Sequence, residues 1–573
     1  MAENWQENMN DWLNGPYDDT TKEYIKQQSE KSPDDLEDAF YKDLEFGTGG
    51  LRGLMGVGTN RINKYTIGMA TQGFANYLNK STSGKASVVI AYDSRNNSRF
   101  FAEITAKVMA ANGVKAYLFE ALRPTPELSF TIRRLRANGG VVCTASHNPK
   151  EYNGYKAYWN DGGQLIPPHD KNVMAEVKKI SSIEEVKWEG NEDLLVALGK
   201  DADEAYIEAI AALSLNRDII KKQHDLKIVY TPIHGTGIEL VPDVLKRFGF
   251  THLSIVEKQA APDGDFPTVV YPNPEESEAM SLGLKQAEET NADILLGTDP
   301  DADRVAVGVK NNHGKWVLLN GNQAAVLLFN YLISSRKELG LDNPNDFVCK
   351  TIVTSDMIDA FAADHDITCM NVLTGFKWIA EKIRENEGKL NFVCGGEESY
   401  GYLIGDQSRD KDAVSAVALI CEMAAVAKEK GRTLFQELIA LSQRYGLYRE
   451  RLKSITRKGM KGSEEIAAMM EGFRKDPPKQ LNGVEVIKVA DYQLGVEKKL
   501  SGGETQEIDL PKSNVLQFFL SDGSKVSARP SGTEPKIKFY FSVNTTLEEA
   551  KDFDAKEAEL EKRIDGIINS LIK

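Results

Sequence analysis

The chain has 573 residues, which is enough for about four domains of ordinary size. Its 70 basic and 85 acidic residues give a net charge of −15, and this balance argues against a general nucleic-acid-binding protein. The five cysteines form no C-x-x-C pair, so neither a disulfide scaffold nor a zinc ribbon is expected. The N-terminal residues lack a signal-peptide pattern, and the most apolar stretch, Val414–Ala427, is too short to span a bilayer. We therefore expect a soluble, reduced, cytoplasmic protein with no membrane or nucleic-acid partner.

The first 40 residues predict helix, and residues 46–58 predict a flexible loop because they contain six glycines in thirteen positions. Short apolar runs then alternate with amphipathic stretches, which predicts βαβ units and a mainly parallel sheet. The expected strands are Ser87–Tyr92, Ala116–Glu120 and Gly140–Ala145, and the expected helices are Phe101–Asn112 and Leu128–Asn138.

The same alternation starts again twice, which indicates three similar α/β domains. The second series has strands at Leu226–Tyr230, Leu253–Val256 and Ile294–Gly297, with helices at Pro242–Phe248 and Glu278–Thr290. The third has helices at Ala324–Arg336, Met357–Ala363, Phe376–Glu385 and Ala413–Glu429, with strands at Phe347–Val353 and Phe392–Cys394.

The last stretch predicts a smaller α+β domain, because three strands are followed by a helix without alternation. These strands are Val515–Leu520, Lys525–Ala528 and Ile537–Ser542, and the helix is Leu547–Leu571. The expected fold is therefore three α/β domains with mixed, mostly parallel sheets and a C-terminal α+β domain, with boundaries at residues 1–205, 206–320, 321–445 and 446–573.

Ser146 follows a predicted strand in the motif T-A-S-H-N-P, at residues 144–149. In α/β folds, ligands bind just beyond the carboxyl ends of parallel strands. Serine, asparagine and proline also favour ordinary turns, so a plain turn is the alternative. A Ser-His-Asp hydrolase is disfavoured because no G-x-S-x-G surrounds Ser146.

Asp299, Asp301 and Asp303 follow the predicted strand Ile294–Gly297 at a spacing of two residues. This spacing places all three carboxylates on one face of an extended segment, where their repulsion favours a bound hard cation such as Mg²⁺. An EF-hand is excluded because its glycine and glutamate positions hold Arg304 and Lys310. A solvated acidic loop and a phosphatase with an aspartate nucleophile are the alternatives.

Two further motifs suggest sugar and phosphate binding. G-G-E-E-S-Y-G, at residues 395–401, presents carboxylates that can accept hydrogen bonds from sugar hydroxyls, and T-G-F-K adds the cation of Lys377. R-P-S-G-T-E-P-K, at residues 529–536, lies between two predicted strands and offers donors to a phosphate. Ordinary turns are again the alternative. A Walker A motif is missing, and residues 46–58 do not fit G-x-G-x-x-G, so neither an ATPase nor a dinucleotide site is supported.

These four motifs, in this order, resemble the α-D-phosphohexomutase superfamily, especially its longer bacterial phosphoglucomutases near the phosphopentomutase branch. The resemblance implies three related α/β domains and a fourth domain like the TATA-box-binding protein, around a central cleft. It also implies a phosphorylated Ser146 that holds one Mg²⁺ per subunit together with Asp299, Asp301 and Asp303.

The remaining site residues are likewise implied by this resemblance. Near the reacting phosphoryl group and metal it places Arg52, His147, Lys156 and Arg304. At the sugar it places Lys377, Glu397 and Ser399. At the non-reacting phosphate it places Arg529, Ser531, Gly532, Thr533 and Lys536.

The implied reaction interconverts glucose 1-phosphate and glucose 6-phosphate, with glucose 1,6-bisphosphate as intermediate and activator, in a monomer or homodimer. Some family members carry a histidine after the sugar loop, in G-E-M-S-G-H, whereas this chain has Ser399-Tyr400-Gly401-Tyr402. Transfer of that histidine's contact is therefore not possible. Phosphopentomutase, phosphomannomutase, an aspartate-nucleophile phosphatase and a non-catalytic sugar-phosphate binder are the alternatives, and either Lys156 or His147 could be the general base.

Overall fold

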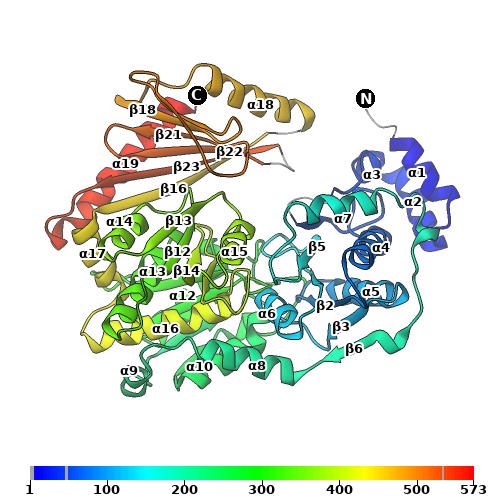
Figure 1. Cartoon of the computed structure of the whole chain (residues 1–573), viewed down its shortest axis with the longest axis horizontal. Coiled ribbons are helices and arrows are strands. Elements are labelled where there is room, and N and C mark those ends of the chain that lie inside the picture. The colour runs from blue at the N-terminus through cyan, green and yellow to red at the C-terminus, as the bar shows by residue number, and fades with distance from the viewer. Residues whose placement is uncertain (1–4, 46–48, 458, 532–534, 573) are drawn as a thin grey trace.

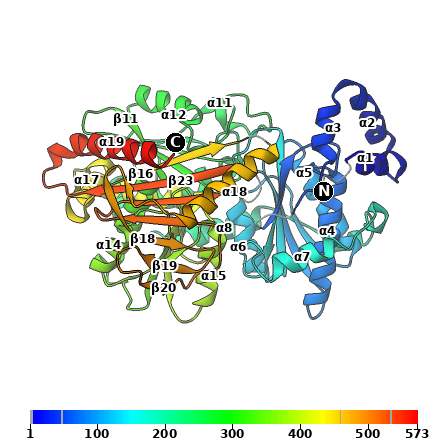
Figure 2. The same ribbon diagram turned by 90° about the horizontal axis from the view of Figure 1, so that it is seen from above.

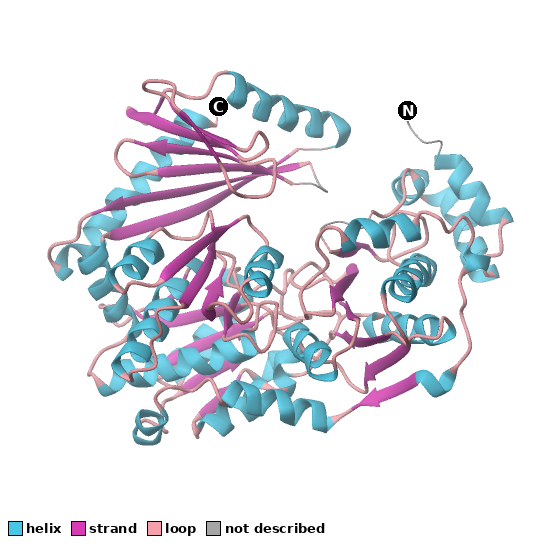
Figure 3. Cartoon of the chain, viewed as in Figure 1, coloured by secondary structure: helices cyan, strands magenta, loops and turns pink. Residues whose placement is uncertain are grey.

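The computed structural model describes residues 5–45, 49–457, 459–531 and 535–572. Three α/β domains follow one another along the chain, and a C-terminal β-rich domain stacks on the third (Figures 1 and 3). The N-terminal domain lies to one side of the other three (Figure 2). One large hydrophobic core runs through the second, third and C-terminal domains, whereas the first domain has cores of its own.

The N-terminal helical stretch is divided into three helices instead of the continuous one predicted: α1 (Trp5–Asn14), α2 (Asp19–Lys31) and α3 (Pro33–Phe40). The break between α2 and α3 comes at Ser32, because proline favours the first position of a new helix. The buried side chains of Trp12, Ile25 and Phe40 join these helices to the first domain.

The three α/β sheets share a four-stranded unit. In each, the first strand lies between the second and the third, all three are parallel, and the fourth pairs antiparallel with the third. In the first domain these strands are β2 (Ser87–Tyr92), β3 (Lys115–Phe119), β4 (Gly139–Cys143) and β5 (Tyr152–Trp159). In the second they are β7 (Ile228–Thr231), β8 (Leu253–Ile255), β9 (Ile294–Thr298) and β10 (Val305–Lys310). In the third they are β12 (Asp346–Thr351), β13 (Thr368–Val372), β14 (Asn391–Gly396) and β15 (Tyr402–Ile404).

Residues 50–54 correct the prediction of a flexible loop, since they form strand β1 (Gly50–Leu54). This strand pairs antiparallel with β5 and sets Arg52 opposite Gly154. A Cβ atom on Gly154 would lie 2.7 Å from the carbonyl oxygen of Leu51, so glycine is needed for this close approach. In β1 itself, a Cβ atom on Gly50 would lie 2.1 Å from the carbonyl oxygen of Tyr155, so a glycine of the predicted loop also permits this strand pairing. Residues 46–48 of the predicted loop lie outside the described residues.

The other strands of the α/β sheets extend their edges: β6 (Leu195–Leu198) in the first domain and β11 (Trp316–Leu319) in the second. The helices predicted for these domains correspond to α5 (Ser98–Ala111), α6 (Thr125–Leu135), α10 (Val241–Phe248), α12 (Ser277–Glu289), α13 (Gly321–Glu338), α14 (Met357–Asp364), α15 (Phe376–Glu385) and α16 (Ala413–Glu429). The prediction missed α4 (Lys64–Ser81), α7 (His169–Val177), α8 (Lys200–Ala211), α9 (Arg217–Lys222), α11 (Glu257–Ala260) and α17 (Leu434–Tyr445).

The C-terminal domain is an antiparallel eight-stranded sheet with helices, richer in strands than predicted. The three predicted strands correspond to β21 (Leu516–Leu520), β22 (Lys525–Pro530) and β23 (Lys536–Thr545). The prediction missed β16 (Leu447–Thr456), β17 (Gln480–Leu481), β18 (Val484–Asp491), β19 (Val496–Lys499), β20 (Thr505–Glu507) and α18 (Gly459–Lys475). The final helix, α19 (Phe553–Leu571), packs Leu560, Ile564 and Ile567 into the core.

Among the described residues, every helix is too short or too polar to cross a membrane.

Candidate active site

Three of the four predicted motifs occupy the same topological position, the loop between the third and fourth strands of the shared unit. Ser146 lies between β4 and β5, Asp299–Arg304 between β9 and β10, and Glu397–Gly401 between β14 and β15. Each loop has a non-glycine residue with positive φ: Ser146 at 52°, Ala302 at 50° and Tyr400 at 66°. Such conformations are held by the surrounding structure and cluster at functional sites.

The Ser146 hydroxyl is buried and points at the acidic motif of the second domain. It donates a hydrogen bond to Asp299 Oδ2 at 2.8 Å and lies 3.1 Å from Nδ1 of His147. Burial, with Arg304 and Arg52 nearby, lowers the pKa of His147 well below its usual range. Arg52 reaches the same loop, donating to the side-chain oxygen of Asn148 at 3.2 Å.

Arg95, a residue that the sequence motifs did not reveal, binds the backbone of the Ser146 loop. The Arg95 guanidinium donates to the backbone carbonyls of Ser146, Asn148, Pro149 and Tyr152. Its charge partner is Asp93, 3.3 Å away, and both side chains are fully buried. Asp93 also accepts from the hydroxyl of Thr144 at 2.6 Å.

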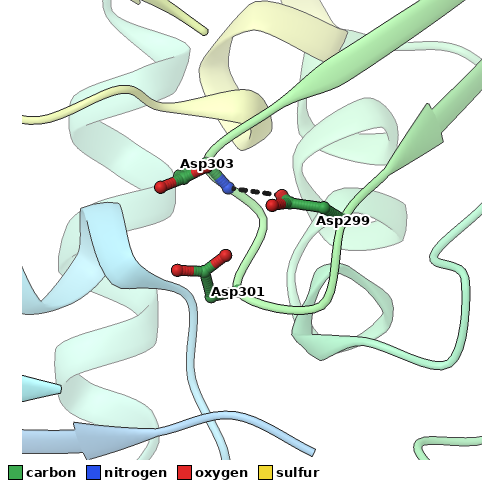
Figure 4. Close-up of side chains that lie close together, drawn as sticks. All are labelled: Asp299, Asp301 and Asp303. Carbon is green, nitrogen blue, oxygen red and sulfur yellow. Dashed lines mark hydrogen bonds between the residues drawn. The ribbon is translucent and has the colours of Figure 1, made fainter. Parts of the chain in front are cut away.

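Asp299, Asp301 and Asp303 converge from one tight turn (Figure 4). Each offers an oxygen within 4.8 Å of the other two, and all three are buried. The turn is fixed because Asp299 Oδ1 accepts the backbone N–H groups of Asp303 and Arg304, each at 3.0 Å. From the first domain, Thr125 adds a hydroxyl hydrogen bond to Asp301 Oδ2 at 2.9 Å.

Two lysines from other domains face these carboxylates. Lys156 of β5 lies 2.7 Å from Asp301 and 3.4 Å from Asp303, and Lys411, just before α16, lies 3.2 Å from Asp303. Burial alone would raise the pKa of Asp301, but Lys156 outweighs it and holds the pKa below its usual range. Burial and the two neighbouring carboxylates raise the pKa of Asp299 well above its usual range.

The donor set fits a hard divalent cation. The Oδ1 atoms of Asp301 and Asp303 are buried and accept no hydrogen bond within the described part of the chain. Buried acceptors of this kind are costly unless a donor or a cation satisfies them. A cation would also relieve the repulsion that raises the pKa of Asp299. All-oxygen donors are typical of Mg²⁺ and Ca²⁺ sites.

The third-domain motif contributes Glu397, which lies close enough to Arg304 of the second domain for their charges to interact. Arg304 forms an ion pair with Glu275 and lies 3.8 Å from Asp303. Glu397 is buried, and its Oε1 accepts the backbone N–H of Gly375 at 2.9 Å. Burial raises the pKa of Glu397 to about 7, with Lys411 opposing this effect and Glu398 adding to it. Ser399 is half-buried on the same loop.

The described residues of the C-terminal motif lie at the adjacent ends of β22 and β23, at the end of the sheet that faces the N-terminal domain (Figure 1). Here the backbone N–H of Ser531 donates a hydrogen bond to the carbonyl of Lys536 at 2.7 Å. Arg529 lies close enough to Lys377 to add to the effect of burial, which lowers the pKa of that lysine. The predicted residues Gly532 and Thr533 lie outside the described residues.

The structure thus gathers Arg52, Ser146, His147, Lys156, Arg304 and the three aspartates around one point, with Glu397 beside them. Four contributors were missed by sequence reasoning: Asp93, Arg95, Glu275 and Lys411. The charged run R-D-K-D at residues 409–412, which precedes the very apolar helix α16, is the one signal that could have revealed Lys411.

Comparison with known proteins identifies the family of the three α/β domains. Family models for domains I, II and III of phosphoglucomutase/phosphomannomutase match residues 43–184, 204–314 and 320–445. A phosphoglucomutase from Staphylococcus epidermidis is 36% identical over 93% of this chain and 96% of that protein. A phosphoglucomutase from Staphylococcus haemolyticus is 37% identical over 95% of this chain and 96% of that protein. The crystal structure titled a putative phosphomannomutase from Thermus thermophilus superposes with a TM-score of 0.67 at 22% identity, covering 92% of this chain and all of that one.

We expect Arg95→Met to lower the free energy of unfolding by about 3–5 kcal/mol, because it leaves the buried Asp93 carboxylate without its charge partner. The double variant Arg95→Met/Asp93→Asn should regain part of this loss. Urea unfolding of the single and double variants measures both effects. Exposed Arg99, paired with Glu103 on α5, provides the matched control, and Arg99→Met should change stability little. Equal stability of Arg95→Met and Arg99→Met would contradict the assignment.

Proposed function

The chain belongs to the phosphoglucomutase/phosphomannomutase family, and we propose that it interconverts glucose 1-phosphate and glucose 6-phosphate through a phosphorylated Ser146. The observation that carries the proposal is the buried Ser146 hydroxyl, 2.8 Å from a carboxylate of the acidic triad and flanked by Lys156 and Arg52. The activity named for the relatives supports the choice of glucose phosphates.

The first transfer moves the phosphoryl group from Ser146 Oγ to the 6-hydroxyl of glucose 1-phosphate. The bond from phosphorus to Oγ breaks, a bond to the sugar oxygen forms, and the hydroxyl proton passes to a base. Lys156 and His147 both lie beside the serine or the triad, and either can take this role. The glucose 1,6-bisphosphate then reorients in the site and returns its other phosphoryl group to Ser146. Phosphoryl transfer depends mainly on alignment and charge neutralisation, which the surrounding cations favour.

Asp299, Asp301 and Asp303, with a phosphate oxygen on Ser146, would hold Mg²⁺, which would neutralise charge on the transferring phosphoryl group. Arg52 and Lys156 add positive charge on the side of the first domain, and Arg304 adds it at the edge of the second.

Glu397 and Ser399, with Lys377, bind the sugar, and Glu397 is the buried acceptor best suited to adjacent equatorial hydroxyls. Arg529, Ser531 and Lys536 hold the phosphate that is not reacting, together with Gly532 and Thr533. Since Lys377 and Arg529 lie near each other, the sugar and the distal phosphate can be held from two domains at once. Opening and closing of the C-terminal domain would then admit and release the substrate.

Replacement of the nucleophile tests the mechanism. Ser146→Ala should lower kcat by at least about 10³-fold, because no other group can accept the phosphoryl group. Intact-mass measurement after incubation with glucose 1,6-bisphosphate should find one phosphoryl group on the wild type and none on the variant. Ser81→Ala, at the exposed end of α4, is the control and should retain both properties. Phosphorylated, active Ser146→Ala protein would refute the assignment, and phosphate on an aspartate would favour the phosphatase class.

The choice of sugar is tested separately, by kcat/KM values for glucose, mannose and ribose 1-phosphates, each with its bisphosphate activator. We expect glucose 1-phosphate to give the highest value, because an acceptor site built for particular hydroxyls rejects sugars that leave its buried groups unpaired. If ribose 1-phosphate is preferred by more than about tenfold, or about 1.4 kcal/mol, the protein is a phosphopentomutase and the mutase mechanism still holds.

Removal of the metal should abolish activity, and added Mg²⁺ should restore it, because the three carboxylates and a phosphoserine otherwise repel one another. Asp301→Asn removes one charged ligand and should weaken metal binding by about tenfold or more, as measured by titration of Mn²⁺ into chelator-treated protein. Asp218→Asn, on the exposed end of α9, should bind the metal like the wild type. Full activity in a chelator, with no metal found by elemental analysis, would rule out a metal requirement.

A further inference from the structure

Asp410 is a fully buried carboxylate at the boundary between the first and third domains, outside every motif considered above. Its Oδ1 accepts the backbone N–H of Lys411 at 2.8 Å and the Nζ of the same lysine at 3.1 Å. Its Oδ2 accepts the hydroxyl of Tyr158 at 2.8 Å and the side-chain amide of Gln164 at 3.0 Å. All four hydrogen bonds therefore either orient Lys411 or join it to the first domain.

The ammonium groups of Lys411 and Lys156, which face the three aspartates, both approach the same carboxylate oxygen of Asp303. Lys411 Nζ lies 3.2 Å from Asp303 Oδ2, and Lys156 Nζ lies 3.4 Å from the same atom. Lys411 comes from the third domain, Lys156 from the first and Asp303 from the second. The position of each ammonium group relative to the triad is therefore set by how the domains are joined.

Asp410 contacts the elements that carry both lysines. It binds Lys411 directly, and it binds Tyr158, which follows Lys156 by two residues on β5. Residues two apart on a strand lie on the same face, so the Tyr158 hydrogen bond fixes the face of β5 that presents Lys156. A single carboxylate thus links the two cations that approach Asp303 Oδ2.

The stem of Lys411 has little freedom, so its head group depends on Asp410. A Cβ atom on Gly401 would lie 2.1 Å from Cδ of Lys411, and the Phe376 ring lies 5.6 Å from its Nζ. Within this confined path the ammonium group has two carboxylate partners within 3.2 Å, Asp303 and Asp410. Without the charge of Asp410, Asp303 would be the one carboxylate left within 3.2 Å among the described residues, with Glu397 a weaker source of attraction.

We propose that Asp410 is a positioning residue: it holds Lys411 partly away from Asp303 and, through Tyr158, fixes the strand that carries Lys156. The part of this inference that concerns turnover rests on the proposed mutase function. The part that concerns the cation does not, because a lysine drawn fully onto Asp303 competes with any metal for that carboxylate. Residues that orient the groups around a metal typically change affinity or activity by 10- to 100-fold.

Mn²⁺ titration of chelator-treated, full-length protein tests the positioning independently of turnover. Asp410→Asn keeps the shape of the side chain but removes its charge, and it should weaken Mn²⁺ binding by about tenfold or more. In a Lys411→Met background, which removes the competing ammonium group at similar volume, Asp410→Asn should change Mn²⁺ affinity less than about twofold, because the amide oxygen can still accept the Tyr158 hydroxyl and so keeps the link to Lys156. A purely structural role for Asp410 would instead lower affinity by the same factor in both backgrounds, and that result would overturn the proposal.

Mutase kinetics of the wild type, Asp410→Asn, Lys411→Met and the double variant form a second double-mutant cycle. Asp410→Asn should lower kcat/KM by about 10- to 100-fold alone and by less than about twofold in the Lys411→Met background. Tyr158→Phe removes one hydroxyl and should lower kcat/KM in the same direction, which keeps the test valid if Asp410→Asn does not fold. Tyr206→Phe removes another buried hydroxyl, beside Asp412, and should change neither readout.

The outcomes separate the two proposals. A wild type that binds Mn²⁺ but does not turn over glucose phosphates would refute the proposed function and leave the metal cycle to decide the role of Asp410. An active wild type in which Asp410→Asn and Tyr158→Phe match Tyr206→Phe would refute the positioning role and leave the function intact.

Discussion

The candidate site is organised around three buried carboxylates that one tight turn brings within 4.8 Å of each other, where their negative charges repel. Buried carboxylates so close together cannot all be charged unless cations surround them. The second domain supplies the carboxylates but only Arg304 as a nearby cation, whereas Lys156 comes from the first domain and Lys411 from the third. The site is therefore complete only when three domains are packed together, which explains why their boundary is rich in buried polar groups such as Asp410, Tyr158 and Thr125.

The shared strand order explains how three separate domains can supply one site. In each sheet the chain reverses direction after the third parallel strand, and the loop at this reversal carries the functional residues. Ligands in α/β folds bind beyond the carboxyl ends of strands, where neighbouring loops diverge. In the proposed mechanism, the same loop position supplies a nucleophile in the first domain, metal-binding carboxylates in the second and sugar acceptors in the third. One backbone geometry thus serves three kinds of chemistry.

Sequence reasoning succeeded where residues that act together are also adjacent in the chain. Asp299, Asp301 and Asp303 share one loop, so their spacing predicted the acidic cluster that the fold contains. Lys411 and Arg95 were missed because they join the site only through tertiary packing, and neither lies in a motif. Strand β1 was missed because glycine was interpreted as a sign of flexibility, although Gly50, in the predicted loop, is required for close pairing with β5. Strand β16 was missed because its side chains are mostly charged or polar and show no alternating apolar pattern.

The residues proposed to bind the distal phosphate lie in a domain with a different kind of fold, and the position of this domain suggests why. This domain is joined to the third through Lys525, which pairs with Asp356 at 2.6 Å, and through Gln517, which donates to the carbonyl of Ile352 at 3.0 Å. Arg529 and Pro530 lie at the other end of the same strand from Lys525. A small rotation of the C-terminal domain against the third would therefore move Arg529 toward or away from a substrate. In a mutase the intermediate must turn over without escaping, so the group that holds the distal phosphate has to release it and bind it again. A residue such as Arg529, at the end of a strand in a domain that can rotate, meets this requirement. A residue in a loop buried among three packed domains does not.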